Sequence, residues 1–295
     1  ESRMKSNGVT PVTRWIVVAF FSGMLLYALL SGCQTTPEKK KLRLYNKGIE
    51  YLQKGEAQSA ILELKNAIEV DGTFADAYYQ LGLAYLKTQE FDKAMIAFGN
   101  AASYDPKNIE ARLQVANYYA SSQRNFEKAV GELEKLRQEY PENARVYAAL
   151  GTAYAAQDKA DEAIVALQKS LDLDPSLVQA GVTLGRIYLR RGEPENTKHT
   201  LETVLQRNPN NAEAQIAMGL FYLETNHLDL AKQFFEKAIT LDPQNIVGQL
   251  DLAEVYLLQQ QPEQAIAETR KIKDLQKDNL SREASLRIQL ILGRA

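Results

Sequence analysis

Apolar residues recur at helical spacing along most of the chain, from residue 41 to residue 279. In the segment 75–108, one apolar stripe follows the pattern i, i+3, i+4, i+7, which places its members on one face of a helix: Tyr78, Leu81, Gly82 and Tyr85. A second stripe comes after it: Ala94, Phe98 and Ala101. Asp105 and Pro106 follow, and proline is not tolerated inside a helix. The pattern therefore predicts two helices and a turn in this segment.

The same two-helix pattern repeats with a period of 34 residues, apart from one interval of 35 residues. A small residue marks each unit at its eighth position: Gly48, Gly82, Ala116, Gly151, Gly185, Gly219 and Ala253. A tyrosine follows three residues later in every unit. Seven units without a gap are therefore predicted: 41–74, 75–108, 109–143, 144–177, 178–211, 212–245 and 246–279. The extra residue of the third unit falls near Gln123, Arg124 and Asn125.

These positions resemble those of the tetratricopeptide repeat (TPR). The resemblance implies an all-α fold, a right-handed α-solenoid of seven helix-turn-helix repeats in which the first helix of each pair lines a concave surface. One helix pair cannot bury its apolar face alone, so neighbouring repeats must stack. Residues 280–295 predict one further helix, either a cap or the start of another repeat, with Leu286 and Leu290 on one side. Because this last helix still carries an apolar face that the sequence leaves uncovered, we expect the chain to be a fragment of a longer protein.

Residues 1–32 have the features of a signal peptide. Basic residues precede an apolar run over residues 15–30, and two small residues separate this run from Cys33. The run has 16 residues, fewer than the roughly 20 that a transmembrane helix needs. Residues 30–33, Leu-Ser-Gly-Cys, resemble the lipobox of bacterial lipoproteins, which implies cleavage before Cys33 and its acylation. Residues 33–40 are then the lipidated cysteine and a short linker. The alternative is an uncleaved membrane anchor.

The lipoprotein resemblance also implies a location. Under the sorting rule of that family, Gln34 directly after the cysteine favours the outer membrane of a Gram-negative cell, facing the periplasm. Three acyl chains would hold the protein on the bilayer almost permanently, because each buried methylene contributes about 0.8 kcal/mol. We therefore expect a lipid-anchored protein of the bacterial cell envelope.

Composition and charge exclude several classes of function. The chain is 45% hydrophobic and carries a formal charge of −2, so it has globular composition without the basic excess that nucleic-acid binding requires. Without residues 1–32 the charge is −4, which predicts little general affinity for anionic headgroups. One cysteine and two histidines are too few for a usual zinc site, and we find no Gly-rich phosphate loop. We predict no catalytic residue, metal, cofactor or small-molecule substrate, and thus no enzyme.

The TPR resemblance implies which residues contact a partner, because the family uses fixed positions of each first helix. The residues carried over are Tyr79, Leu83, Lys87, Leu113, Asn117, Arg186, Arg190, Ile216, Leu220 and Leu250. Such an apolar groove with two arginines suits an amphipathic helix or an extended peptide that places a carboxylate at Arg186 and Arg190. Two other interpretations stay open: the leucines pack between first helices, or Arg190 pairs with Glu224, its equivalent in the next repeat.

Together these patterns predict a non-enzymatic, membrane-anchored scaffold that binds a protein or peptide and assists the assembly of an envelope secretion or export system. Among TPR lipoproteins, the chain resembles those of exopolysaccharide secretion and the pilotins of type IV pilus secretins. The motifs do not separate these groups, because they encode the stack of helices and not its partner. A further alternative is a regulatory segment of a larger enzyme whose catalytic part lies beyond Ala295.

Overall fold

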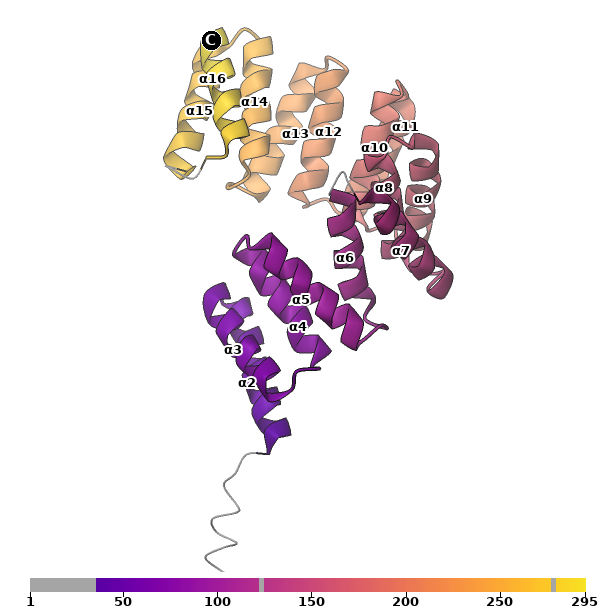
Figure 1. Cartoon of the computed structure of the whole chain (residues 1–295). Coiled ribbons are helices and arrows are strands. Elements are labelled where there is room, and N and C mark those ends of the chain that lie inside the picture. The colour runs from indigo at the N-terminus through magenta and orange to yellow at the C-terminus, as the bar shows by residue number, and fades with distance from the viewer. Residues whose placement is uncertain (1–35, 122–124, 277–279) are drawn as a thin grey trace, which may run out of the picture. The chain divides into compact units, whose positions relative to one another are not determined.

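The computed structural model describes residues 36–121, 125–276 and 280–295, so the predicted signal peptide, Cys33 and most of the predicted insertion in the third repeat lie outside the described residues. Fifteen helices and no strand are found in the described residues (Figure 1), which confirms the all-α prediction. The helices are α2 (Pro37–Gln53), α3 (Ala57–Val70), α4 (Ala75–Lys87), α5 (Phe91–Tyr104), α6 (Ile109–Ser121), α7 (Phe126–Glu139), α8 (Ala144–Ala156), α9 (Ala160–Leu173), α10 (Val178–Arg190), α11 (Pro194–Arg207), α12 (Ala212–Glu224), α13 (Leu228–Leu241), α14 (Ile246–Leu258), α15 (Pro262–Gln276) and α16 (Arg282–Arg294).

The chain divides into two compact units, residues 1–111 and 112–295. In the first unit, α2 pairs with α3 and α4 pairs with α5, and α3 packs against α4. In the second unit, four pairs follow one another: α8 with α9, α10 with α11, α12 with α13, and α14 with α15. The first helices α8, α10, α12 and α14 lie side by side, and α16 packs on both α14 and α15 (Figure 1). The helix-turn-helix stacking predicted from the sequence is therefore confirmed.

The small residue at the eighth position of a repeat lets the two helices of the pair approach closely. A Cβ atom added to Gly219 would lie 2.6 Å from Cε1 of Phe235, on the second helix of the same repeat. Gly82 and Phe98 form the same contact at 2.5 Å. Both phenylalanines are fully buried. The repeated glycine is therefore required by packing, since real Cβ atoms do not approach a ring this closely.

The turn between the two helices of a repeat contains one residue in the left-handed conformation. These residues recur at the repeat period: Gly55, Gln89, Asp158, Gly192, Asn226 and Gln260, with φ between 58° and 78°. Only glycine adopts this conformation without steric cost. Four of the six turns therefore hold a side-chain-bearing residue in this conformation, and the steric cost is larger at Gln89 and Gln260 than at Asp158 and Asn226, since aspartate and asparagine tolerate it better.

We expect Gln260→Gly to stabilise the protein by about 0.5–1 kcal/mol and the reverse change, Gly192→Gln, to destabilise it by about 1 kcal/mol, because left-handed backbone disfavours a Cβ atom. The urea midpoint at constant m-value measures both effects. Gln233→Gly, on the exposed face of α13, serves as a control and should destabilise by about 1 kcal/mol, since glycine is a poor helix former. A lower midpoint for Gln260→Gly would contradict the strain.

The first helix begins at Pro37, four residues before the predicted start of the first repeat at residue 41. The Oγ1 atom of Thr36 accepts a hydrogen bond from the backbone N–H of Lys39 at 3.3 Å, and proline occupies the first helical position. A threonine cap followed by proline is a strong helix start. The predicted linker over residues 33–40 is therefore wrong in length, because α2 already includes its second half.

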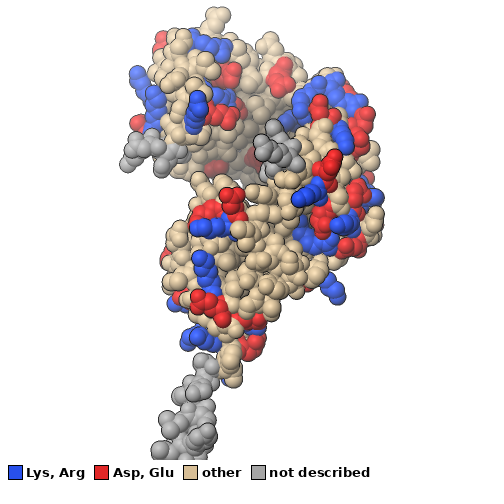
Figure 2. Space-filling model, viewed as in Figure 1, with Lys and Arg blue, Asp and Glu red and all other residues tan. Residues whose placement is uncertain are grey.

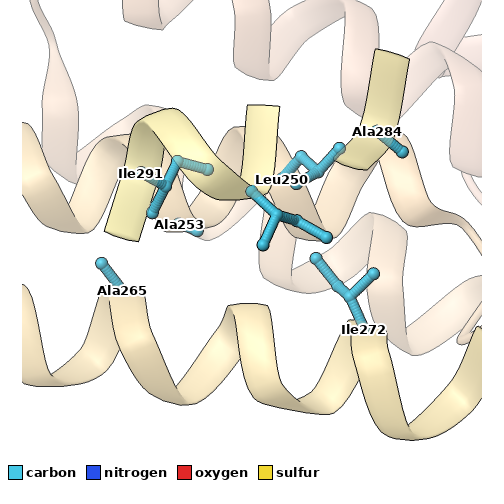
Figure 3. Close-up of a cluster of buried hydrophobic side chains, with 7 residues drawn as sticks. Leu250, Ala253, Ala265, Ile272, Ala284 and Ile291 are labelled. Carbon is cyan, nitrogen blue, oxygen red and sulfur yellow. The ribbon is translucent and has the colours of Figure 1, made fainter. Parts of the chain in front are cut away.

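Helix α16 covers the last repeat with an apolar face. Ala284, Ile288 and Ile291 are buried against α14 and α15, where they meet Leu250 and Ile272 (Figure 3). On the other side of α16, the side chains of Leu286 and Leu290 are 51% and 66% exposed. The predicted terminal helix thus exists, and one of its faces seals the core of the second unit.

Candidate partner-binding face

The first helices α8, α10, α12 and α14 of residues 112–295 carry accessible side chains, which include Arg186, Arg190, Leu220 and Leu258. We call the accessible side of these four helices the first-helix face. Arg186 and Arg190 lie one turn apart on α10 and are both exposed. Among the described residues, neither arginine forms a hydrogen bond or an ion pair. Two guanidinium groups are therefore available to an external acceptor.

The predicted pair between Arg190 and Glu224 does not form within the described part of the chain, although α10 and α12 are neighbours. Both side chains are exposed. A different contact joins these helices, because the Nε2 atom of Gln179 donates a hydrogen bond to Glu213 at 2.5 Å. The two arginines thus stay uncompensated on their own helix.

Three predicted contact residues are buried, so the expectation that they touch a partner is wrong. Leu113, Ile216 and Leu250 are only 3%, 8% and 2% exposed. The following helix covers the latter two: Ile216 lies beside Gly248 of α14, and Leu250 packs against α16. These leucine and isoleucine side chains stabilise the stack of first helices, which is the other interpretation that the sequence left open.

The remaining predicted residues are accessible to different degrees. Lys87 and Asn117 are exposed, whereas Tyr79, Leu83 and Leu220 are half-buried. The ring of Tyr79 packs on Phe98 with a centroid distance of 5.6 Å, so its apolar part is already used within its own repeat. Arg186 and Arg190 lie on α10, and Leu220 lies on α12, the first helix that packs beside it.

Exposed apolar side chains are also present at the C-terminal end of the second unit. Leu258 on α14 is 44% exposed, and Leu286 and Leu290 on α16 are 51% and 66% exposed. Glu254, between them, is bound by Arg287 at 3.4 Å and Arg294 at 3.9 Å. The sequence predicted this helix as a cap or the start of another repeat, with Leu286 and Leu290 on one side; the exposure of that side follows from how α16 packs on α14 and α15.

Two hollows lie on the opposite side, between successive second helices. One, of about 590 Å³, separates α7 from α9 and is lined by Tyr154 and Ala166 among others. The other, of about 510 Å³, separates α9 from α11 and is lined by Tyr188 and Thr200. The repeat 212–245 has Phe234 at the position that Ala166 and Thr200 occupy in the two repeats before it, so both hollows have a small residue there. The ring of Phe234 stacks on Tyr222 with a centroid distance of 5.4 Å. Figure 2 shows basic and acidic side chains interleaved on the face that carries α9 and α11.

One buried pair of titratable groups has a clear structural role, Asp251 with Arg287. No group of three or more His, Cys, Asp or Glu side chains that could hold a metal is present there. Burial raises the pKa of Asp251 above its usual value, while a hydrogen bond from Arg287 at 2.7 Å opposes that rise. This pair joins α14 to α16, so a buried carboxylate helps to hold the terminal helix in place.

The described helices are each too short or too polar to cross a membrane.

Sequence comparison identifies the family. The profile described as tetratricopeptide repeat matches residues 120–184, 188–238 and 227–290, which together exceed half of the chain. Two further TPR profiles match residues 48–89 and 75–108. The chain therefore belongs to the tetratricopeptide repeat family. No curated protein sequence matches it as a relative.

Solved structures share the fold at low sequence identity. A tetratricopeptide repeat protein from Parabacteroides merdae ATCC 43184 gives a TM-score of 0.66 at 19% identity, over 86% of this chain and 99% of that chain. The APC/C hetero-tetramer Cut9-Hcn1 gives 0.65 at 16% identity, over 89% of this chain and 50% of that chain. PilW, a type IV pilus biogenesis factor, gives 0.58 at 16% identity, over 69% and 94%. TPR folds are typically non-catalytic scaffolds that bind protein partners.

Proposed function

We propose that this protein is a scaffold that binds an acidic segment of a protein partner on its first-helix face. The observation that carries the proposal is the pair Arg186 and Arg190, which are exposed and have no ionic partner in the described residues. Arginine presents its N–H groups in a planar fork that matches a carboxylate, and it is weakly hydrated, so it suits interfaces. A partner with one or two carboxylates can satisfy both side chains.

Apolar contacts beside the arginines supply the rest of the proposed interface. Leu220 lies on the adjacent helix, and Leu258, Leu286 and Leu290 extend the surface toward α16. An amphipathic helix or an extended peptide would place its acidic side chain at α10 and its apolar side chains along this row. The arginines fix the register of the partner, and the leucines contribute area.

We expect the double change Arg186→Glu/Arg190→Glu to weaken capture of the partner at least tenfold, because two attractive contacts become repulsive. Crosslinking of the membrane-associated protein, followed by identification and titration of the captured partner, measures this. Arg207→Glu/Lys237→Glu is the matched control, since both residues are exposed on second helices and the change in net charge is equal. Unchanged capture by the first variant, with circular dichroism unaltered, would refute the role of the arginines.

We further propose that acylation of Cys33 anchors this scaffold in the bacterial cell envelope, at the outer membrane facing the periplasm. The support is the lipobox-like stretch Leu30-Ser31-Gly32-Cys33 after an apolar run with basic residues before it. Cys33→Ala should leave an uncleaved precursor without incorporated fatty acid, as measured by radiolabelled palmitate and by the mass of the N-terminus. Equal fatty-acid labelling of variant and wild type would contradict the proposal that Cys33 is acylated.

Such an anchored scaffold suits the assembly of an envelope secretion or export system, in which a partner is captured where it reaches the membrane. The fold that it shares with PilW keeps a pilotin-like role in type IV pilus secretin assembly as the second candidate. The crosslinking experiment separates the two, because it identifies either a secretin subunit or a component of another export system.

A further inference from the structure

The N-terminal end of the stack is formed by a basic helix face. In the later repeats, the third residue of the first helix is buried against the preceding repeat: Ala77, Val146, Ala180 and Ala214. The seventh residue is buried in the same way: Leu81, Leu150, Leu184 and Met218. In the first repeat, Arg43 and Lys47 stand at these two places, and both are exposed. Helix α2 thus presents cations where the other first helices present apolar contacts.

Some cations of α2 form ion pairs, and three near the start of the helix do not. On α2, Lys41 binds Glu38 and Asp71, and Lys47 binds Glu63; Lys54, directly after the helix, binds Glu50. The remaining cations of this helix are exposed and form no ion pair within the described residues: Lys39, Lys40 and Arg43. Leu42, among them, is 43% exposed. Figure 2 shows basic side chains, and acidic ones as well, near the point where the described chain begins.

These cations lie close in the chain to the cysteine that we propose to be lipidated. Only residues 34–36 separate Cys33 from the first turn of α2. At about 3.3–3.6 Å per extended residue, the start of the helix stays within roughly 15 Å of the acylated sulfur. The potential of an anionic surface extends about one Debye length, roughly 10 Å at 0.1 M salt. The net charge of the whole chain is therefore less relevant at the membrane than this local cluster.

We propose that Lys39, Lys40 and Arg43 bind anionic phospholipid headgroups and hold the N-terminal end of the stack against the membrane. This inference rests on the proposed lipid anchor. Anionic phosphate groups complement three cations that have no acidic partner in the described residues, and the exposed Leu42 can enter the interface between headgroups and acyl chains. The anchor then sets the location of the protein, and the basic face restricts its orientation.

The test uses the mature lipidated protein with Asn46→Cys, an exposed position on α2 that can be labelled alone because acylation consumes the Cys33 thiol. The fluorescent label is quenched by nitroxides attached to lipid headgroups, in vesicles of phosphatidylcholine with or without phosphatidylglycerol. We expect strong quenching only with phosphatidylglycerol at about 0.1 M salt and its loss at about 1 M, where the Debye length is about 3 Å. Lys39→Gln/Lys40→Gln/Arg43→Gln should reduce headgroup residence roughly 100-fold, at about fivefold for each cation.

The control variant Lys65→Gln/Lys87→Gln/Lys107→Gln removes the same charge elsewhere in residues 36–111, where all three lysines are exposed, and it should leave quenching unchanged. Equal quenching in both vesicle types, with the protein still floating with the vesicles, would overturn this inference and leave the anchor intact. Absence of the protein from the floated vesicles would overturn the anchor and this inference together.

Discussion

Arg287→Met is expected to lower the free energy of unfolding by about 3 kcal/mol, because it strands a carboxylate inside the protein. The Oδ1 atom of Asp251 accepts a hydrogen bond from Arg287 at 2.7 Å, and Oδ2 is buried without a hydrogen-bond partner in the described residues. Asp251 is 3% exposed, so water cannot replace the lost guanidinium. Chemical denaturation of the variant and the wild type measures the difference.

The double variant Asp251→Asn/Arg287→Met should recover much of this loss, because the buried charge is then absent. Arg282→Met serves as the control, since Arg282 is exposed at the start of the same helix and makes no ion pair in the described residues. A loss as large in the double variant as in Arg287→Met would show that packing of the arginine stem, rather than its charge, matters.

The same pair gives a pH dependence with a definite sign. Burial raises the pKa of Asp251 in the folded state, so the folded protein binds a proton more readily than the unfolded chain between the two pKa values. Stability from this group therefore increases as the pH falls toward the folded pKa and below it. Arg287→Met removes the hydrogen bond that opposes the rise in the pKa of Asp251, so the carboxylate of the variant is protonated more readily. The loss of stability of the variant relative to the wild type should therefore be smaller at about pH 5 than at about pH 7. A deficit that grows on acidification would contradict this account.

The periodic features of the fold were predictable because they obey short-range rules. A small residue at the eighth position and a large one on the second helix recur in the first six repeats, and Gly219 with Phe235 shows the close contact that demands them. A proline marks the end of five of the seven units, as Pro106 does after α5. Seven copies of one pattern also average out the errors that a single copy would leave.

The exposure of the partner-binding residues was less predictable, because it depends on what covers each side chain. Ile216 and Leu220 are both apolar and lie on the same face of α12, yet α14 covers only the former fully. Asp251 and Arg287 are separated by 36 residues and meet only because α16 folds back on α14. The early start of α2 at Pro37 had a local signal in Thr36, but the repeat period masked it.

Gly219→Ala is expected to lower the free energy of unfolding by about 2 kcal/mol, although alanine is a better helix former than glycine. The new Cβ atom would lie 2.6 Å from Cε1 and 2.8 Å from Cδ1 of Phe235, whose ring is rigid and fully buried. Gly185→Ala should cost less, since its nearest neighbour is a flexible leucine atom, Cδ2 of Leu201, at 3.0 Å. Urea unfolding of both variants gives the comparison.

A smaller partner should relieve this clash, and the chain itself supplies the precedent. In the third repeat, Ala116 and Leu133 occupy the places of Gly219 and Phe235, and both are fully buried. Gly219→Ala/Phe235→Leu should therefore be more stable than the sum of its single variants predicts, with a favourable coupling of about 1 kcal/mol in a double-mutant cycle. Strict additivity would mean that helix spacing, rather than contact between these two side chains, sets the cost. Because the first six repeats pair a small residue with leucine or phenylalanine at these two positions, the coupling tests the packing rule that these repeats share.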